Sequence, residues 1–329
     1  MKVVVTGSSG FIGSALISSL RADGVKTHGI DIRLPRWREP HPDDHHVDMN
    51  DGTALEACLI RLKPDQIVHL AARTDISADS VVKYNVNIDG VTNLAHAAHR
   101  AESVRRVLWT SSQLVSRVGR IPTHDTDYEP DTSYGESKVI TERIVRGLDG
   151  CSMEWAILRP TTVWGPGMSD HYLSLLRYLE SGRYFHAGGT RTLKSFSYIY
   201  NAVHQIRGLM QAPASQIHRT TFYIADDKPI DMRSWCDALS AELGARASPV
   251  VPVAAARILA CTGDVLNATI APNFKFNSFR LHNILTPYVF NTDNLQAVVG
   301  PLPNDEASAI KQTVAWYRNV AKSGPEQHT

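Results

Sequence analysis

The chain opens on an apolar run followed at once by a glycine-rich turn, and this pairing constrains the fold more than any other feature. Three valines predict a buried strand, and residues 6–13 then read Thr-Gly-Ser-Ser-Gly-Phe-Ile-Gly before an amphipathic, helix-like stretch over 11–22. In this order, Gly7 permits the tight turn, Gly10 lets the backbone approach phosphates, and Gly13 lets the helix pack on the strand. The N–H groups at the helix N-terminus attract an anion, so the turn predicts a site for a dinucleotide pyrophosphate.

An acidic residue closes the next apolar run. Asp31 ends the segment 27–31, where a carboxylate can accept hydrogen bonds from both hydroxyls of the adenosine ribose and repel a 2′-phosphate. This position favours NAD over NADP. Arg33 follows two residues later and leaves NADP open, because an arginine there can accommodate the phosphate.

A tyrosine and a lysine four residues apart supply the candidate chemistry. Tyr134 and Lys138 share one face of a predicted helix. A neighbouring ammonium favours the phenolate, so we expect Lys138 to lower the pKa of Tyr134 and make it a base near neutral pH.

Strand-like and helix-like runs alternate through the first half of the chain. The pattern predicts strands at 2–6, 26–31, 66–70, 105–110 and 153–158, and helices near 11–22, 52–62, 78–100 and 134–148. Such alternation is typical of an α/β fold, a doubly wound parallel sheet of the Rossmann type. We expect residues 1–160 to form this domain, with a return segment near 195–225 in which 195–200 and 221–224 are short strands, and 161–329 to form mainly a smaller C-terminal substrate domain.

Charge and cysteine usage exclude several classes. With 34 basic and 33 acidic residues, nothing indicates a nucleic-acid partner. Cys58, Cys151, Cys236 and Cys261 form no Cys-x-x-Cys pair, which indicates a reducing cytoplasm and no zinc site. The histidine-rich stretch 41–46 is interpreted as a solvated loop. No signal-peptide pattern opens the chain, and the apolar run 249–261 is too short to span a bilayer, so no membrane insertion is expected.

Together these motifs resemble the extended branch of the short-chain dehydrogenase/reductase superfamily, and within it the NAD-dependent epimerase/dehydratase family that modifies nucleotide sugars. The branch carries the spacing Thr-Gly-x-x-Gly-Phe-Ile-Gly, which is intact at residues 6–13. The resemblance implies NAD as the cofactor. It implies cofactor contacts by Gly7, Gly10, Phe11, Ile12, Gly13, Asp31, Asp48, Met49, Leu70, Ala71, Ala72, Asn87, Tyr134, Lys138 and Pro160.

The same resemblance assigns the catalytic and substrate groups. Ser112, at the end of Trp109-Thr110-Ser111-Ser112, matches the catalytic serine or threonine and is favoured over Ser111. Tyr134 takes the proton of a substrate hydroxyl, and Lys138 holds the nicotinamide ribose. The implied substrate contacts are Ser112, Gln113, Tyr134, Thr162, Lys194 and Arg280.

An NAD-dependent epimerase acting on a nucleotide sugar, through transient oxidation of a sugar hydroxyl to a ketone, is the function that we predict. Family members that dehydrate sugars carry an acidic pair after the catalytic serine or threonine. Gln113 and Leu114 occupy those positions here, and neither is an acid or base near neutral pH.

Three alternatives stay open. A 4-keto-sugar reductase would use the same residues. The segment 198–203 resembles the hydroxysteroid dehydrogenase side of the branch, and the apolar stretch 249–261 would then line a pocket for a hydrophobic alcohol. A non-catalytic NAD sensor is disfavoured by the intact pair of Tyr134 and Lys138.

The resemblance also implies a homodimer. Helices 78–100 and 134–148 would meet their copies in a four-helix interface, which the small and apolar residues Val82, Val86, Val139 and Ile140 permit.

Overall fold

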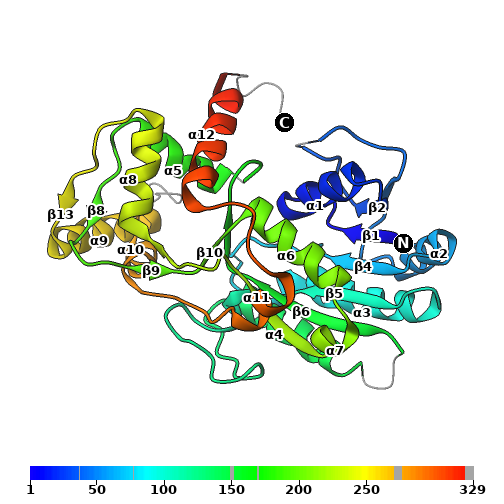
Figure 1. Cartoon of the computed structure of the whole chain (residues 1–329). Helices are drawn as coiled ribbons and strands as arrows, with labels where there is room; N and C mark the ends of the chain where they lie inside the picture. The colour runs from blue at the N-terminus through cyan, green and yellow to red at the C-terminus, as the bar shows by residue number, and fades with distance from the viewer. Residues whose placement is uncertain (37, 77, 149–151, 169, 270–275, 323–329) are drawn as a thin grey trace.

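The computed structural model describes residues 1–322 except 37, 77, 149–151, 169 and 270–275 (Figure 1). Its described part centres on a seven-stranded sheet in the order β11-β6-β5-β4-β1-β2-β3, with every neighbouring pair parallel. The strands are β1 (Lys2–Thr6), β2 (Lys26–Asp31), β3 (Asp44–His46), β4 (Gln66–His69), β5 (Arg106–Thr110), β6 (Glu154–Pro160) and β11 (Thr220–Ile224).

Helices cover both faces of this sheet because consecutive side chains of a strand point to opposite sides. Val4 packs into one buried cluster with helices α2 and α3, whereas Val3 and Val5 pack into another with α1 and α6. The elements around the sheet are α1 (Phe11–Ala22), α2 (Gly52–Leu62), η1 (Val81–Tyr84), α3 (Asn85–Arg100), η2 (Gln113–Val115), α4 (Ser133–Arg146), α6 (Ile199–Gln211), α7 (Ala214–Ile217) and α11 (Asp293–Val299). The predicted doubly wound α/β fold is confirmed.

The other elements gather on the side of the molecule away from β1 and β2 (Figure 1). A third buried cluster, built around Trp164, Phe196 and Trp235, holds α5, α8 and α12 together. The elements are β7 (Thr162–Trp164), α5 (Asp170–Glu180), β8 (His186–Ala187), β9 (Leu193–Lys194), β10 (Phe196–Tyr198), β12 (Ile230–Asp231), α8 (Met232–Leu243), β13 (Val250–Val251), α9 (Val253–Thr269), α10 (Ser278–Leu285) and α12 (Glu306–Lys322). Between them, α6 packs on α1 and β11 pairs with β6. The domain boundary at residue 160 stays a prediction.

The prediction of a solvated loop over residues 41–46 is wrong in its second half, where Asp44–His46 forms β3. Gly29 donates its N–H to the carbonyl of Asp43 (2.9 Å), and β2 then pairs with β3 in register. The Asp44 carboxylate accepts hydrogen bonds from Arg21 (2.8 Å) and Arg38 (2.6 Å). The free edge of β2 and the contacts with Arg21 and Arg38 make this strand, and no pattern within residues 41–46 records them.

Two element boundaries also differ from expectation. The predicted strand over 195–200 ends at Tyr198, and Ile199 begins α6, because the apolar side chains of that helix cover β6 and β11. The predicted helix over 78–100 is a 3₁₀ turn over Val81–Tyr84 followed by α3.

Candidate active site

The glycine turn closes tightly against the end of β4. Gly7 has φ +67°, and a Cβ there would lie 2.6 Å from the Ala71 nitrogen. A Cβ on Gly13 would lie 2.1 Å from the Gly7 oxygen. Glycine is therefore required at both positions. Gly10 precedes α1 as its N-cap and has no side chain to cap it, so the first N–H groups of that helix stay available to an anion, as a pyrophosphate site requires.

The Asp31 carboxylate fixes the backbone beside the same turn. One carboxylate oxygen accepts the N–H of Ser9 and the other accepts the N–H of Arg33, each at 3.0 Å. The carboxylate lies at the cleft wall, where it suits ribose hydroxyls and opposes a 2′-phosphate. The guanidinium of Arg33 is 4.0 Å from it and largely exposed.

Ser112, Tyr134 and Lys138 meet where β5 ends and α4 begins. Ser112 forms a hydrogen bond with the phenol of Tyr134. Lys138 donates from Nζ to the carbonyl of Thr110 at 2.9 Å. All three side chains are buried from bulk water and line one cavity, so a reacting hydroxyl there meets a serine, a phenol and an ammonium together.

Burial dominates the proton affinities of this group. It raises the pKa of Tyr134 to about 12, against which the hydrogen bond with Ser112 acts. It lowers the pKa of Lys138 to about 8. The expectation that Lys138 lowers the pKa of Tyr134 is wrong for this structure, because its ammonium turns to Thr110 and lies 5.9 Å from the ring centroid.

A buried ion pair anchors the residue next to Ser112. Ser111 donates to the Glu142 carboxylate at 2.6 Å, and Arg159 donates to the same carboxylate at 2.8 Å from both Nε and Nη2. Burial acts to raise the pKa of Glu142, but the hydrogen bond and charge of Arg159, together with the hydrogen bond from Ser111, hold it below its usual range. Sequence reasoning missed this pair. The spacing of Tyr134, Lys138 and Glu142 along α4 is the signal that was available.

A further glycine sets the approach of α4 to the serine. A Cβ on Gly135 would lie 2.1 Å from the carbonyl oxygen of Leu114, which belongs to the turn η2 after Ser112. The missing side chain therefore lets α4 bring Tyr134 beside Ser112.

Asn87 alone among the predicted cofactor residues does not line the cavity. It is buried, its Oδ1 accepts the N–H of Arg73 (2.7 Å), and its Nδ2 donates to the Arg73 carbonyl (3.1 Å) and to Ser137 (3.3 Å). It joins the loop after β4 to α4, so it supports the site without lining the cavity.

One cavity of about 2660 Å³ collects the other predicted residues. Those residues are Gly7, Gly10, Phe11, Ile12, Gly13, Asp31, Asp48, Met49, Leu70, Ala71, Ala72, Ser112, Gln113, Tyr134, Lys138, Pro160, Thr162, Lys194 and Arg280. Its volume exceeds that of an ordinary small-molecule site and leaves room for a dinucleotide and a second ligand. The uncapped N-terminus of α1, the Asp31 carboxylate at the cavity wall and the volume of the cavity fit NAD.

The substrate end of the cavity is only partly basic. Lys194 donates to the backbone carbonyl of Asn283 (2.6 Å) and to its Oδ1 (2.9 Å), and burial lowers the lysine pKa to about 8. Arg183 and Arg280 also line the wall, beside aromatic and aliphatic side chains. These are Leu175, Tyr184, Phe185, Phe196, Phe276 and Ile284.

The expectation that residues 249–261 line a hydrophobic pocket is wrong. The cavity is lined instead by Phe276 and the α10 residues that follow it. The reason is the orientation of α9, which turns the small Ala256 and Ala260 inward against α10.

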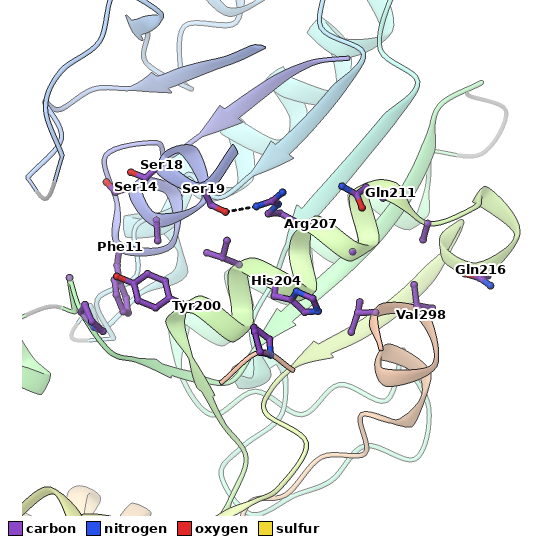
Figure 2. Close-up of a pocket in the computed structure, with 18 of the residues that line it drawn as sticks. Phe11, Ser14, Ser18, Ser19, Tyr200, His204, Arg207, Gln211, Gln216 and Val298 are labelled. Carbon is purple, nitrogen blue, oxygen red and sulfur yellow. Dashed lines mark hydrogen bonds between the residues drawn. The ribbon is translucent and has the colours of Figure 1, made fainter. Parts of the chain in front are cut away.

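A second cavity, of about 800 Å³, lies between α1 and α6 (Figure 2). Of the predicted site residues it contains only Phe11. Arg207 crosses it and donates to Ser19 at 2.6 Å, and it pairs with Asp23. This cavity holds none of the catalytic candidates.

Among the described residues, no three His, Cys, Asp or Glu side chains gather as a metal site. No described helix is long and apolar enough to cross a membrane. Cys58, Cys236 and Cys261 are free thiols, and Cys151 lies outside the described residues. Val139, expected at a dimer interface, is buried within the chain itself, whereas Val82 is exposed. The homodimer stays a prediction.

Comparison with known proteins gives one family and relatives of several kinds. Residues 3–225 match the NAD dependent epimerase/dehydratase family. A 3-beta-hydroxysteroid dehydrogenase of Mycolicibacterium neoaurum is 28% identical over 252 residues, 70% of this chain and 67% of the relative. An Escherichia coli O157:H7 protein named N-acetyl-alpha-D-glucosaminyl-diphospho-ditrans,octacis-undecaprenol 4-epimerase is 28% identical over 219 residues, 62% of this chain and 62% of the relative. The match therefore spans less than two thirds of the latter.

A solved structure shares the whole fold. UDP-glucose 4-epimerase from Thermotoga maritima superposes with a TM-score of 0.75 at 17% identity, covering 98% of this chain and 100% of that chain.

Proposed function

Because the chain belongs to the NAD dependent epimerase/dehydratase family and is an NAD-dependent enzyme, we propose that it is a nucleotide-sugar epimerase. It oxidises one sugar hydroxyl to a ketone and reduces that ketone from the opposite face. The residues proposed to carry the chemistry are Ser112, Tyr134 and Lys138.

The observation that carries this proposal is that Ser112, Tyr134 and Lys138 line one cavity while the two positions after Ser112 hold neither an acid nor a base. Gln113 and Leu114 follow Ser112 and also line the cavity. Neither side chain exchanges a proton near neutral pH, so these two positions supply no acid or base to work on a neighbouring carbon. The trio supports proton transfer at a single carbinol, which is the chemistry of an epimerase, a dehydrogenase or a reductase.

Each residue of the trio has a distinct part. Tyr134 exchanges the proton of the substrate oxygen, and its raised pKa keeps the phenol protonated, which is the form that can donate to a ketone. Ser112 hydrogen-bonds the same oxygen and orients it. Lys138 lies in the cavity wall, where its ammonium would hold the nicotinamide ribose of bound NAD. Bound NAD supplies the hydride acceptor.

The residues proposed to hold NAD follow the cleft wall. The N-terminus of α1 takes the pyrophosphate, and Asp31 takes the adenosine ribose. Asp48, Met49, Leu70, Ala71, Ala72 and Pro160 complete the wall.

Basic side chains at the far end of the cavity support a substrate diphosphate. Arg183, Lys194 and Arg280 line that end together. The name of the Escherichia coli relative, a 4-epimerase of a sugar joined to a diphosphate, supports the same reaction class.

A hydrophobic alcohol is the second candidate substrate, for a dehydrogenase reaction. Two observations favour it: the aromatic wall around Phe185 and Phe276, and the Lys194 ammonium already bonded to Asn283. The hydroxysteroid dehydrogenase relative belongs to this alternative.

A panel of UDP-, GDP- and dTDP-hexoses, with NAD far below the substrate concentration, separates these functions. NMR of the anomeric protons follows the sugar while absorbance follows NADH. An epimerase accumulates a new sugar beyond the NAD added, with no net NADH.

The other results have clear readings. Product limited to the NAD supplied, with NADH rising in step, assigns a dehydrogenase instead. No product from any hexose overturns the nucleotide-sugar proposal, and 4-keto sugars and sterols become the next substrates to test.

A further inference from the structure

The second cavity, between α1 and α6, has the size of a small-molecule site. Its volume of about 800 Å³ lies within the range of roughly 300–1,000 Å³ that such sites occupy. Phe11 and Gly167 line both this cavity and the large one, and the other residues of its wall line this cavity alone. A ligand held here would therefore be a neighbour of the proposed NAD site and would not occupy it.

Hydrogen-bond donors gather on the wall that α6 provides. Along one face of that helix, at spacings of four, three and four residues, lie Tyr200, His204, Arg207 and Gln211 (Figure 2). The facing wall belongs to α1 and contributes the hydroxyl groups of Ser14, Ser18 and Ser19. None of the described residues that line the cavity is an aspartate or a glutamate. A wall rich in donors and without acids favours an anionic ligand.

Two side chains of α6 have hydrogen-bonding capacity that the described chain does not use. Arg207 donates to Ser19 from Nη1 and to Asp23 from Nη2, whereas a guanidinium carries five N–H donors. The Nε2 atom of His204 is buried and makes no hydrogen bond to the described residues. Buried polar atoms are ordinarily hydrogen-bonded, so this imidazole and this guanidinium indicate a place for a further polar group.

The ion pair between Arg207 and Asp23 leaves room for such a group. Asp23 does not line the cavity, and its side chain is 53% exposed, against 25% for Arg207. An exposed ion pair contributes little to stability because water competes for both partners. A carboxylate that arrives from the cavity can therefore replace Asp23 on Arg207, and its two oxygens match the parallel N–H donors of the guanidinium.

Apolar side chains complete the cavity. They are Phe11, Val203, Val298, Val299 and Trp316. A single guanidinium beside an apolar wall suits a ligand with one negative charge and a small apolar body.

We propose that this cavity binds a small organic monocarboxylate. The carboxylate takes the place of Asp23 on Arg207, and the apolar body packs on Val203 and Val299. A bound acid would also contact α1, the helix whose N-terminus is proposed to hold the pyrophosphate of NAD. The site goes beyond the proposed function and holds whichever substrate is turned over.

Titration of the full chain with benzoate, followed through the NMR signals of the ligand, tests the proposal. Benzamide is the uncharged probe of the same shape. We expect benzoate to bind at least about tenfold more tightly than benzamide, because hydrogen bonds to a charged group are the stronger kind. Arg207→Met should remove this preference and leave the affinity for benzamide unchanged. Thermal unfolding of this variant without ligand checks that its fold is intact.

The Asp23→Asn variant should act in the opposite direction. It removes the acid that competes for Arg207, so benzoate should bind more tightly, by roughly two- to fivefold. Asp23 is more than half exposed, so this variant keeps the test decisive even if Arg207→Met fails to fold. Matched controls on α3, which covers the other face of the sheet, are Arg100→Met and Asp89→Asn. They make the same changes of charge and should leave the affinity for benzoate unchanged.

Binding needs no turnover, so these outcomes are independent of the hexose panel. Absence of benzoate binding overturns the proposal, and so does equal affinity in the unmodified chain and Arg207→Met. Weaker binding in Asp23→Asn also overturns it, because the carboxylate then does not take the place of Asp23. Loss of binding in Lys194→Met, with retention in Arg207→Met, would place benzoate in the large cavity instead.

Discussion

At the scale of single residues, burial and charge act against each other in the site. Tyr134 and Lys138 lie in the same buried wall, and burial keeps both nearer their neutral forms. The protonation states of Tyr134 and Lys138 in the working enzyme therefore depend on the ligands that enter the cavity. A sequence spacing identifies the two residues but carries no information on how much water reaches them.

The Tyr134→Phe variant tests the proton-transfer role. The phenol hydroxyl is lost while the ring remains, so we expect turnover to fall roughly 10²- to 10⁴-fold with NAD binding retained. Steady-state kinetics and a fluorescence titration with NAD measure the two effects. Turnover at the original level would show that the phenol is not the proton donor.

The Lys138→Met variant separates stability from function. Burial lowers the lysine pKa from 10.5 to about 8, which at about 1.4 kcal/mol per pKa unit costs roughly 3 kcal/mol at pH 7. Losing the hydrogen bond to Thr110 costs about 1 kcal/mol, which offsets part of the gain from removing the buried ammonium. We expect the variant to be inactive but more stable at pH 7 by about 2 kcal/mol.

The pH dependence of stability gives an internal check on that variant. Between pH 8 and 10.5 the unfolded chain binds more protons than the folded chain, so Lys138 makes the original protein more stable as the pH rises through this window. Urea unfolding at pH 7 and at pH 10 should show the advantage of Lys138→Met shrinking. An advantage that grows with pH would contradict the burial of a charged lysine.

At the scale of elements, α4 carries the site because two contacts fix its position. Gly135 admits the Leu114 carbonyl at its first turn, and Glu142 joins it to Arg159 of β6 two turns later. The helix itself was predicted from its apolar periodicity. Its approach to η2 and its ion pair with β6 depend on residues distant in the chain.

A methyl group on Gly135 should separate Tyr134 from Ser112. Because the added Cβ would lie 2.1 Å from the Leu114 oxygen, α4 must shift, and a displacement of about 1 Å costs roughly 10²-fold in rate. Gly147→Ala, at the other end of α4, is the control, since its Cβ meets the nearest oxygens only at 3.4 Å. Kinetics of both variants measure the effect, and equal activities would contradict it.

Removing the Glu142 charge should destabilise the protein. Arg159 is 1% exposed and would keep an uncompensated charge, which costs about 3–5 kcal/mol. Glu136→Gln, on the exposed side of the same helix, should change the unfolding free energy by no more than about 0.5 kcal/mol. Urea unfolding compares Glu142→Gln with this control, and similar values for both would argue against a buried ion pair.

At the scale of the whole molecule, the large cavity lies between the sheet and the elements that follow residue 160. Its walls come from the carboxyl ends of the strands on one side and from β9, β10 and α10 on the other. A ligand that spans both sides stabilises the folded chain as a unit.

NAD should raise the unfolding free energy by about 2.7 kcal/mol at a concentration 100 times its dissociation constant. NADP at the same concentration should give less, because Asp31 opposes the 2′-phosphate. Thermal unfolding with each nucleotide measures the difference, and Asp31→Ser should reduce it. A larger shift with NADP than with NAD would overturn the assigned preference.

The sequence by itself determined whatever short-range chemistry specifies. The glycine turn and the alternation of apolar runs predicted the sheet and its helices, because both are written in consecutive residues. The family resemblance of the motifs added the site residues, and all of them except Asn87 line the cavity. Tertiary structure alone decided the rest. The strand β3 forms only because the edge of β2 is free to pair with it. Asn87 is held by Arg73 and Ser137, and the raised pKa of Tyr134 follows from its burial. Ile258 and Val265 of α9 are exposed because Ala256 and Ala260 on the other side of that helix pack against α10. In each case a contact between segments far apart in the chain sets the energy, and no local pattern records such contacts.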